Sequence, residues 1–291
     1  MIFVHEVCFS GIQSTGWEDC TMKNGKYKIK RYKVKRGKGL LWALLTLAVA
    51  AAALFFLNKE HILSLPAFTI PALSPEEMQQ QTRVITLPDG QWFALQLGAF
   101  EEEQSARSLA DSFRSRGAAG HVYPGDTYRV LAAAYENRES AQAVQAQLAL
   151  NHGVDAYLYP IARSEVILRL TGQKAQLDAL EDAFCLCDQL TYTLAGLSEA
   201  LDRGEMTFQE AVQALSSQRE TVQALNNRLL ARFSRDEHAA VLQLCSILSE
   251  TDNLLAQAIQ SSGAARLGSG IKACQLYLIC SLEEYVRFLS P

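Results

Sequence analysis

The hydrophobic and polar positions of residues 91–161 follow one pattern twice. Apolar residues alternate along Trp92–Phe100 and give way to a helical spacing, and the same order returns 35 positions later from Thr127–Tyr135 onward. Each copy ends near a glycine, Gly117 or Gly153, ahead of a short apolar run. Alternation with a period of two predicts a strand, and apolar positions three and four apart predict a helix. Each copy therefore predicts a β-α-β unit.

Two such units in tandem predict an α+β domain of the ferredoxin-like β-α-β-β-α-β type, with four strands and both helices on one side of the sheet. Because side chains alternate between the two faces of a strand, Leu95 and Val130 are expected to pack beneath the helices. The opposite face is predicted to be bare. The polar and aromatic residues that alternation places there are Trp92, Gln96, Arg129, Tyr157 and Tyr159.

These side chains have the chemistry of a carbohydrate site. Aromatic rings stack on the apolar CH faces of sugars, while the amide of Gln96 and the guanidinium of Arg129 can form hydrogen bonds with hydroxyl and N-acetyl groups. A structural role is the alternative interpretation. In that case Trp92 would hold the preceding segment, and Tyr157 and Tyr159 would be ordinary edge residues.

Two short phrases of this segment are those of a known family. Residues 94–100 read Ala-Leu-Gln-Leu-Gly-Ala-Phe, close to the VQVGAF of that family, and residues 128–130 read Tyr-Arg-Val. Together with the duplication, they make residues 91–161 resemble the SPOR domain, a peptidoglycan-binding module of bacterial envelope proteins. One departure is Ala-Ala-Tyr at 133–135, where the family often has Gly-Pro-Phe.

The resemblance implies a binding surface on the bare face of the sheet, with a preference for glycan strands stripped of stem peptides. Such strands mark division sites, and the resemblance leaves both division and sporulation septa open as the place of binding. By this analogy Gln96 and Arg129 contact the glycan, Ala99 fills a position that requires a small residue, and Tyr157 lies beside the groove. Thr127 stands where some members have an aromatic residue, so stacking would rest on Trp92 and Tyr157 instead.

Residues 1–38 are predicted to be a basic cytoplasmic segment, and residues 39–57 one transmembrane helix. Nine Lys and Arg and no acidic residue lie within 23–38, and the eighteen residues 40–57 carry no charge. Such a run can cross a bilayer, and its basic flank faces the cytoplasm. We therefore expect a single-pass protein of the bacterial plasma membrane, with the bilayer as a partner and the division septum as its location. A cleaved signal peptide is the alternative, and Met22 could be the natural start.

Residues 58–90 contain four prolines and a run of three glutamines. Prolines at this spacing block helices and favour extended chain, which predicts a somewhat stiff linker between membrane and sheet. A strap packed on the domain is the alternative, with Val84–Leu87 as a short strand.

Residues 163–291 are predicted to form an all-α bundle of four helices. Leucines and other apolar residues recur three and four apart, and Thr207 with Glu210 has the spacing of a capping box. Four long helices joined by short turns favour an up-down bundle, with Gly263, Gly268 and Gly270 marking the last turn. The bundle resembles no known family. It could bind a protein partner, and a scaffold acting mainly through it, with little glycan binding, is the alternative function.

Charge argues against nucleic acid as a partner. The chain has 27 basic and 31 acidic residues, and the part beyond the predicted membrane span keeps 18 basic and 28 acidic ones. An RNA-recognition domain shares the strand order but needs an aromatic-rich third strand. That strand here reads Tyr-Arg-Val-Leu-Ala-Ala. RNA binding is therefore disfavoured.

No pattern of catalytic or metal-ligating residues is present. The five histidines stand in separate segments without an H-E-x-x-H or similar pair, so we expect no enzyme activity, no metal and no cofactor. Cys187, Cys245 and Cys274 fall on the apolar stripes of the predicted helices and are expected in the core. A disulfide involving Cys245, Cys274 or Cys280 remains open.

Overall fold

The computed structural model describes residues 80–233 and 238–289. The predicted cytoplasmic segment, the predicted membrane span at 39–57 and the first part of the predicted linker lie outside these residues. Within the described ranges, no helix combines the length and hydropathy that crossing a membrane requires.

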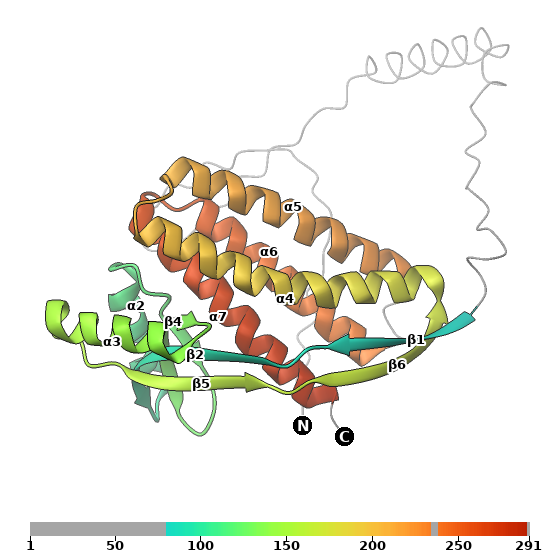
Figure 1. Cartoon of the computed structure of the whole chain (residues 1–291), viewed down its shortest axis with the longest axis horizontal. Helices are drawn as coiled ribbons and strands as arrows, with labels where there is room; N and C mark the ends of the chain where they lie inside the picture. The colour runs from blue at the N-terminus through green and yellow to red at the C-terminus, as the bar shows by residue number, and fades with distance from the viewer. Residues whose placement is uncertain (1–79, 234–237, 290–291) are drawn as a thin grey trace, which may run out of the picture. The chain divides into compact units, whose positions relative to one another are not determined.

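The duplicated segment forms a four-stranded antiparallel sheet in the order β3-β4-β2-β5, with two helices (Figure 1). This order confirms the predicted β-α-β-β-α-β topology. The elements are β2 (Gly90–Phe100), α2 (Glu103–Arg114), β3 (His121–Tyr123), β4 (Tyr128–Tyr135), α3 (Arg138–His152) and β5 (Tyr157–Arg163).

Both helices pack on one face of this sheet, as predicted. Leu95 is buried there with Ala141 of α3, and Val130 is buried with Ala106 and Ala110 of α2. The small alanines let the helices approach the strands closely. Gly153 ends α3 in the left-handed conformation, with φ of 61°, which glycine adopts without steric cost.

A second, two-stranded sheet extends beyond the first. β1 (Gln80–Leu87) pairs with β6 (Val166–Gln173) in antiparallel register. These strands precede β2 and follow β5 along the chain (Figure 1). Ile85 and Leu87 are buried in the core of the helical region. Residues 80–87 therefore form a strand and differ from the predicted linker, and the alternative of a short strand at Val84–Leu87 is confirmed.

Four long helices follow as predicted, but they begin at residue 174 because 166–173 belong to β6. They are α4 (Lys174–Asp202), α5 (Phe208–Arg232), α6 (Ala239–Ile259) and α7 (Ala264–Leu289). Consecutive helices pack on each other, and α7 also packs on α4, which closes the bundle. The capping box of Thr207 and Glu210 is present at the start of α5.

Gly268 and Gly270 differ from their predicted place in a turn, since both lie inside α7. Only Gly263, with φ of 93°, makes the turn. A Cβ on Gly270 would stand 2.7 Å from Cβ of Ala258 on α6. This glycine therefore allows the two helices to pack closely.

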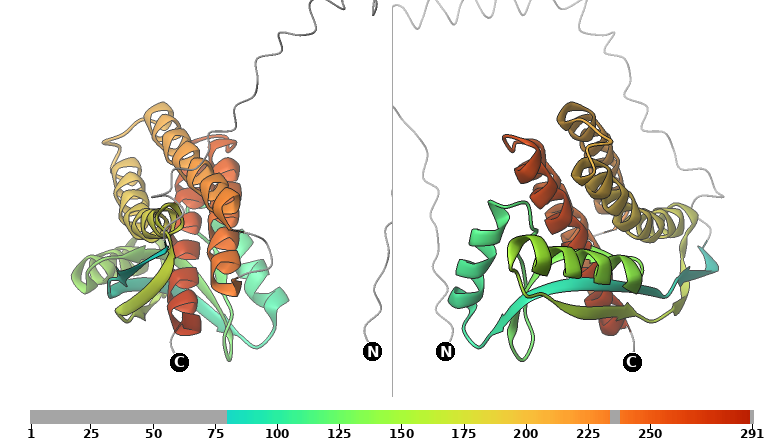
Figure 2. Two further views of the ribbon diagram at one scale, coloured as in Figure 1. Left: turned by 90° about the vertical axis from the view of Figure 1, so that its right-hand side faces the viewer. Right: turned by 60° about the vertical axis from the view of Figure 1, so that its left-hand side comes forward.

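Helix α7 covers part of the second face of the four-stranded sheet. Figure 2 shows α2 and α3 on one side of the strands and α7 on the other. The prediction of a bare face is thus wrong for this part of the sheet, because the bundle that follows in the sequence packs back on it.

Candidate functional site

The contact between α7 and the sheet is apolar at its centre. Leu276, Ile279 and Cys280 of α7 are buried against residues of the second face. The sheet residues of this α7 interface are Trp92, Ala94, Leu131, Ala134 and Ile161. All of these side chains are at most 5 % exposed, as in the core of a single domain.

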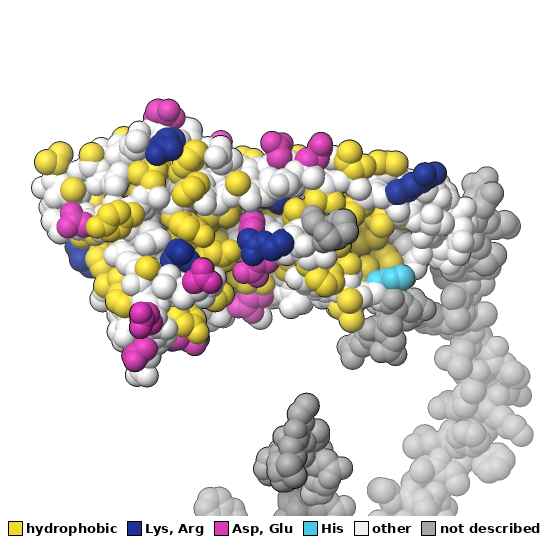
Figure 3. Space-filling model, turned by 90° about the horizontal axis from the view of Figure 1, so that it is seen from below, with side chains coloured by type: hydrophobic (Ala, Val, Ile, Leu, Met, Phe, Trp, Pro, Cys, Tyr) yellow, Lys and Arg dark blue, Asp and Glu magenta, His cyan; other side chains and the backbone are white. Residues whose placement is uncertain are grey.

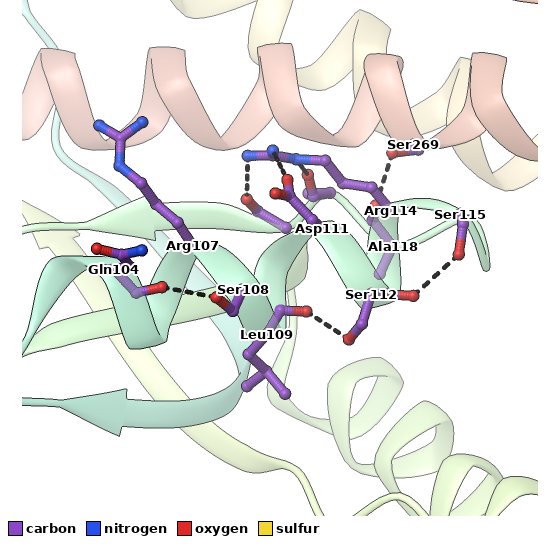
Figure 4. A network of polar contacts seen from close by, with 12 residues as sticks. Gln104, Arg107, Ser108, Leu109, Asp111, Ser112, Arg114, Ser115, Ala118 and Ser269 are labelled. Atoms are coloured by element: carbon purple, nitrogen blue, oxygen red, sulfur yellow. Dashed lines mark hydrogen bonds and ion pairs between the residues drawn. The ribbon is translucent and has the colours of Figure 1, made fainter.

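Polar contacts surround this apolar centre. Figure 4 shows Ser269 on α7 donating a hydrogen bond of 2.7 Å to the carbonyl of Ala118. Lys272 donates to the carbonyl of Gly117 at 3.1 Å, and Gln275 to that of Ala134 at 3.4 Å. Hydrogen bonds of this kind offset the cost of removing polar groups from water. The α7 interface therefore has the composition of a permanent contact.

Trp92 belongs to this interface and differs from its predicted place on an open face. Its ring is 5 % exposed and lies 5.0 Å from the ring of Tyr192 on α4. A sugar cannot stack on a ring that the bundle already covers. This geometry fits the alternative interpretation, a structural role for Trp92. The ring packs against the helical bundle, however, and not against the preceding linker as that interpretation had it.

The other five predicted residues lie together where α7 leaves the sheet. Their Cα register puts Gln96 opposite Tyr157, Ala99 opposite Arg129, and Ala94 opposite Tyr159. Residues opposite each other in antiparallel strands share a face. We call this group the uncovered end of the sheet: Gln96, Ala99, Arg129, Tyr157 and Tyr159. Tyr159 borders the α7 interface and also packs against it.

A β-bulge brings Ala99 to this face. Strict alternation would place residues 96 and 99 on opposite faces, but the register shifts between Gln96 and Gly98. A Cβ on Gly98 would stand 3.2 Å from the side chain of Leu109 on α2, so residue 98 faces the helices. The bulge therefore turns Ala99 outward beside Gln96, an example of a bulge redirecting a side chain.

The guanidinium of Arg129 is positioned by an aromatic ring and a backbone carbonyl. Its guanidinium carbon lies 5.1 Å from the centre of the Tyr159 ring, and Nη1 is 3.5 Å from the carbonyl oxygen of Thr127. Residues 80–233 and 238–289 offer it no ion pair. The result is a half-buried cation on an aromatic ring, with its charge still available to a ligand.

Side chains from both edges of the sheet meet at this end. β3 and β5 are the edge strands, which the strand spacing alone would separate by about 14 Å. The rings of Tyr123 on β3 and Tyr159 on β5 are nevertheless only 6.2 Å apart. These two side chains therefore lean toward each other across this face, with Tyr123 buried and Tyr159 half-buried.

The remaining side chains are accessible. Tyr157 is 64 % exposed, Ala99 is exposed, and Gln96 is half-buried. An exposed ring, an amide and a guanidinium thus lie on one face of the sheet. This arrangement can stack on a sugar and form hydrogen bonds with its substituents.

Charged side chains are dispersed over the face of the molecule that is seen from below. The view from below in Figure 3 shows acidic and basic side chains interspersed among hydrophobic and other ones, without a basic patch on that face. A nucleic-acid surface would gather positive charge along a face or groove.

The cysteines fit a structural role. Cys187, Cys245 and Cys274 are buried in the bundle core, as predicted, and burial raises the pKa of the Cys187 thiol to about 12. Cys280 is buried in the α7 interface. The five cysteines in the described residues are all free, and no group of three or more His, Cys, Asp or Glu in those residues could hold a metal.

Comparison with protein families matches residues 90–160 to the SPOR domain, within one residue of the predicted 91–161. No match is found among curated proteins or solved structures. The SPOR match covers β2, β3, β4 and the first part of β5, with α2 and α3. It supports peptidoglycan binding by this part of the chain, and a binding domain rather than a catalytic one.

Proposed function

We propose that the protein is a single-pass protein of the bacterial plasma membrane that binds peptidoglycan through the uncovered end of its SPOR domain. Its ligand is glycan stripped of stem peptides, which enriches the protein at division septa. The observation that carries this proposal is Arg129, a half-buried cation on the ring of Tyr159 without an ion-pair partner in the described ranges. It lies on the same face as Gln96 and the exposed Tyr157.

Each group has a matching part of a glycan strand. The ring of Tyr157 offers a face for the CH surface of a sugar, and the amide of Gln96 can both donate to and accept from an N-acetyl group. The guanidinium of Arg129 can donate two hydrogen bonds to a carboxylate or to hydroxyl oxygens. Removal of the stem peptide frees a carboxylate on the sugar, which favours binding at this cation. Ala99 leaves room for the strand above β2.

The test of this proposal is binding of the purified full chain to isolated cell walls before and after treatment with an amidase that removes stem peptides. We expect amidase treatment to increase binding. Gln96→Ala should lower the affinity for the treated walls by about two- to tenfold, because one neutral hydrogen bond is lost. If the wild type and the Gln96→Ala variant bind treated walls equally well, Gln96 does not contact the glycan.

Topology is a second part of the proposal. The basic residues 23–38 and the uncharged residues 40–57 favour a cytoplasmic N-terminus and exterior C-terminal domains. Protease added to intact protoplasts is expected to digest the chain after Asn58 and to leave an N-terminal fragment. Protection of the helical bundle until the membrane is permeabilised would reverse the orientation and exclude a role at the wall.

A further inference from the structure

The last turns of α7 reach the uncovered end of the sheet. The hydroxyl of Tyr123 donates a hydrogen bond of 3.3 Å to the carboxylate of Glu283 on α7. That carboxylate also forms an ion pair with Arg287, one turn further along the helix. The side chain of Glu283 is only 14 % exposed. A carboxylate of the bundle is thus fixed against a tyrosine of the SPOR sheet.

Tyr123 connects this carboxylate to the proposed glycan site. Its ring lies 6.2 Å from the ring of Tyr159, and Tyr159 in turn carries the guanidinium of Arg129 at 5.1 Å. Successive contacts therefore connect Glu283 to the ring of Tyr123, that ring to the ring of Tyr159, and Tyr159 to the guanidinium of Arg129. Burial, and then the negative charge of Glu283, raise the pKa of Tyr123, so its hydroxyl keeps the proton that it donates.

We propose that Glu283 is a positioning residue for the glycan site, so that the site is shared between the SPOR sheet and the helical bundle. This inference rests on the proposed glycan binding. The carboxylate fixes the ring of Tyr123, that ring supports Tyr159, and Tyr159 holds the guanidinium of Arg129 toward the ligand. Glu283 itself does not contact the glycan.

The physical reason is the position of Tyr123 at an edge of the sheet. β3 has only three residues and pairs with β4 alone, so its backbone holds the ring less firmly than a central strand would. The ring leans inward over the sheet, and its buried hydroxyl needs an acceptor. Glu283 is that acceptor. Without it the hydroxyl would turn toward water and move the ring away from Tyr159.

The bundle therefore affects binding without covering the site. The α7 interface holds the helix on the sheet through Leu276 and Ile279, and Glu283 lies one turn beyond that apolar contact. A small displacement of the last turns of α7 would move the acceptor of Tyr123. Any partner that bends these turns would change the affinity for glycan.

The experiment measures binding of the full-length protein to amidase-treated glycan strands. Tyr123→Phe keeps the ring and removes the donor, and Glu283→Ala removes the acceptor. Each is expected to lower affinity about three- to tenfold, and the double variant should be no weaker than the weaker single variant, because both changes break one interaction. Glu283→Gln keeps an acceptor oxygen and should restore most of the affinity.

Glu199→Ala is the matched control. Glu199 on α4 forms an ion pair with Arg203 four residues on, as Glu283 does with Arg287, but it makes no hydrogen bond to the sheet. The Glu199→Ala variant should bind amidase-treated glycan strands with the affinity of the wild type. Thermal unfolding of every variant is measured in parallel. If Glu283→Ala unfolds the chain, the affinity of Tyr123→Phe for the glycan strands is the result that tests the inference.

Two outcomes would overturn the inference. Unchanged affinity of folded Tyr123→Phe would show that the hydrogen bond does not position the site. Higher affinity of Glu283→Ala would show that α7 masks the glycan surface instead of supporting it. Failure of the proposed function is distinguishable, because Gln96→Ala and Arg129→Ala would then also bind as wild type does.

Discussion

Replacing Leu276 by aspartate is expected to destabilise the sheet and the bundle together. Leu276 is fully buried between α7 and the sheet, at 0 % exposure. A carboxylate there loses its hydration, and the apolar packing of the cluster that contains Leu276, Trp92 and Leu131 is lost as well. We expect a loss of at least about 4 kcal/mol in the free energy of unfolding.

Denaturant unfolding followed by two probes measures this effect. Trp92 lies in the α7 interface, so its fluorescence reports that contact, and circular dichroism at 222 nm reports the helices. The two transitions should coincide in the wild type and move together to lower denaturant in Leu276→Asp. For this purpose Trp17 and Trp42 are replaced by phenylalanine in all variants.

Leu230→Asp is the matched control for this variant. Leu230 lies on α5 and is 45 % exposed, so the same chemical change should cost within about 0.5 kcal/mol. Separate transitions in the wild type, or a Leu276→Asp variant as stable as the control, would mean that α7 does not hold the two parts together in solution.

Removing both polar groups of the uncovered end is expected to have the largest effect on binding. The double variant Gln96→Ala with Arg129→Ala should bind amidase-treated glycan about a hundredfold more weakly than wild type. The guanidinium accounts for the greater part, because hydrogen bonds from a charged donor contribute about 1.5–3 kcal/mol and neutral ones about 0.5–1.5 kcal/mol. A fluorescent fusion of the double variant should lose its enrichment at septa.

The matched control changes the same two residue types on the opposite side of the domain. Gln104 and Arg107 lie on α2 (Figure 4), and both are exposed. Arg107 forms an ion pair with Glu103 on the same helix. Alanine at both positions should leave binding unchanged. Wild-type affinity of the Gln96 and Arg129 double variant would place glycan binding elsewhere, and the bundle would then be the first candidate.

Period-two alternation was sufficient to predict the sheet and its inner face. Leu95 and Val130 lie beneath the helices because each strand is long enough for the pattern to be unambiguous. The position of Ala99 could not be derived in this way. A bulge inserts one residue, Leu97, between the paired residues Gln96 and Gly98, and the glycine that follows it is the only local signal.

The cover over the second face was missed, although the sequence contains a signal for it. Residues 276–280 read Leu-Tyr-Leu-Ile-Cys, five apolar residues in a row, whereas a helix that buries one stripe alternates apolar and polar positions. Leu278 faces the bundle core, and Leu276 and Ile279 face the sheet. An apolar run of this kind indicates burial on two sides but does not reveal the second partner.

The positioning role of Tyr123 and Glu283 had no sequence signal. They are 160 residues apart, and each is unremarkable in its own segment, a short strand and a charged helix end. Only packing of α7 on the sheet brings them together. The strand β1 was equally hard to place, because its partner β6 lies beyond the whole SPOR domain.

Hydrogen–deuterium exchange of the full chain, with and without amidase-treated glycan strands, tests the central claim most directly. Bound glycan should slow exchange at the backbone amides of residues 94–100, 127–131 and 157–159, and leave those of α2 and α5 unchanged. Slowing confined to the helical bundle, or to α2 and α3, would contradict a glycan site at the uncovered end of the sheet.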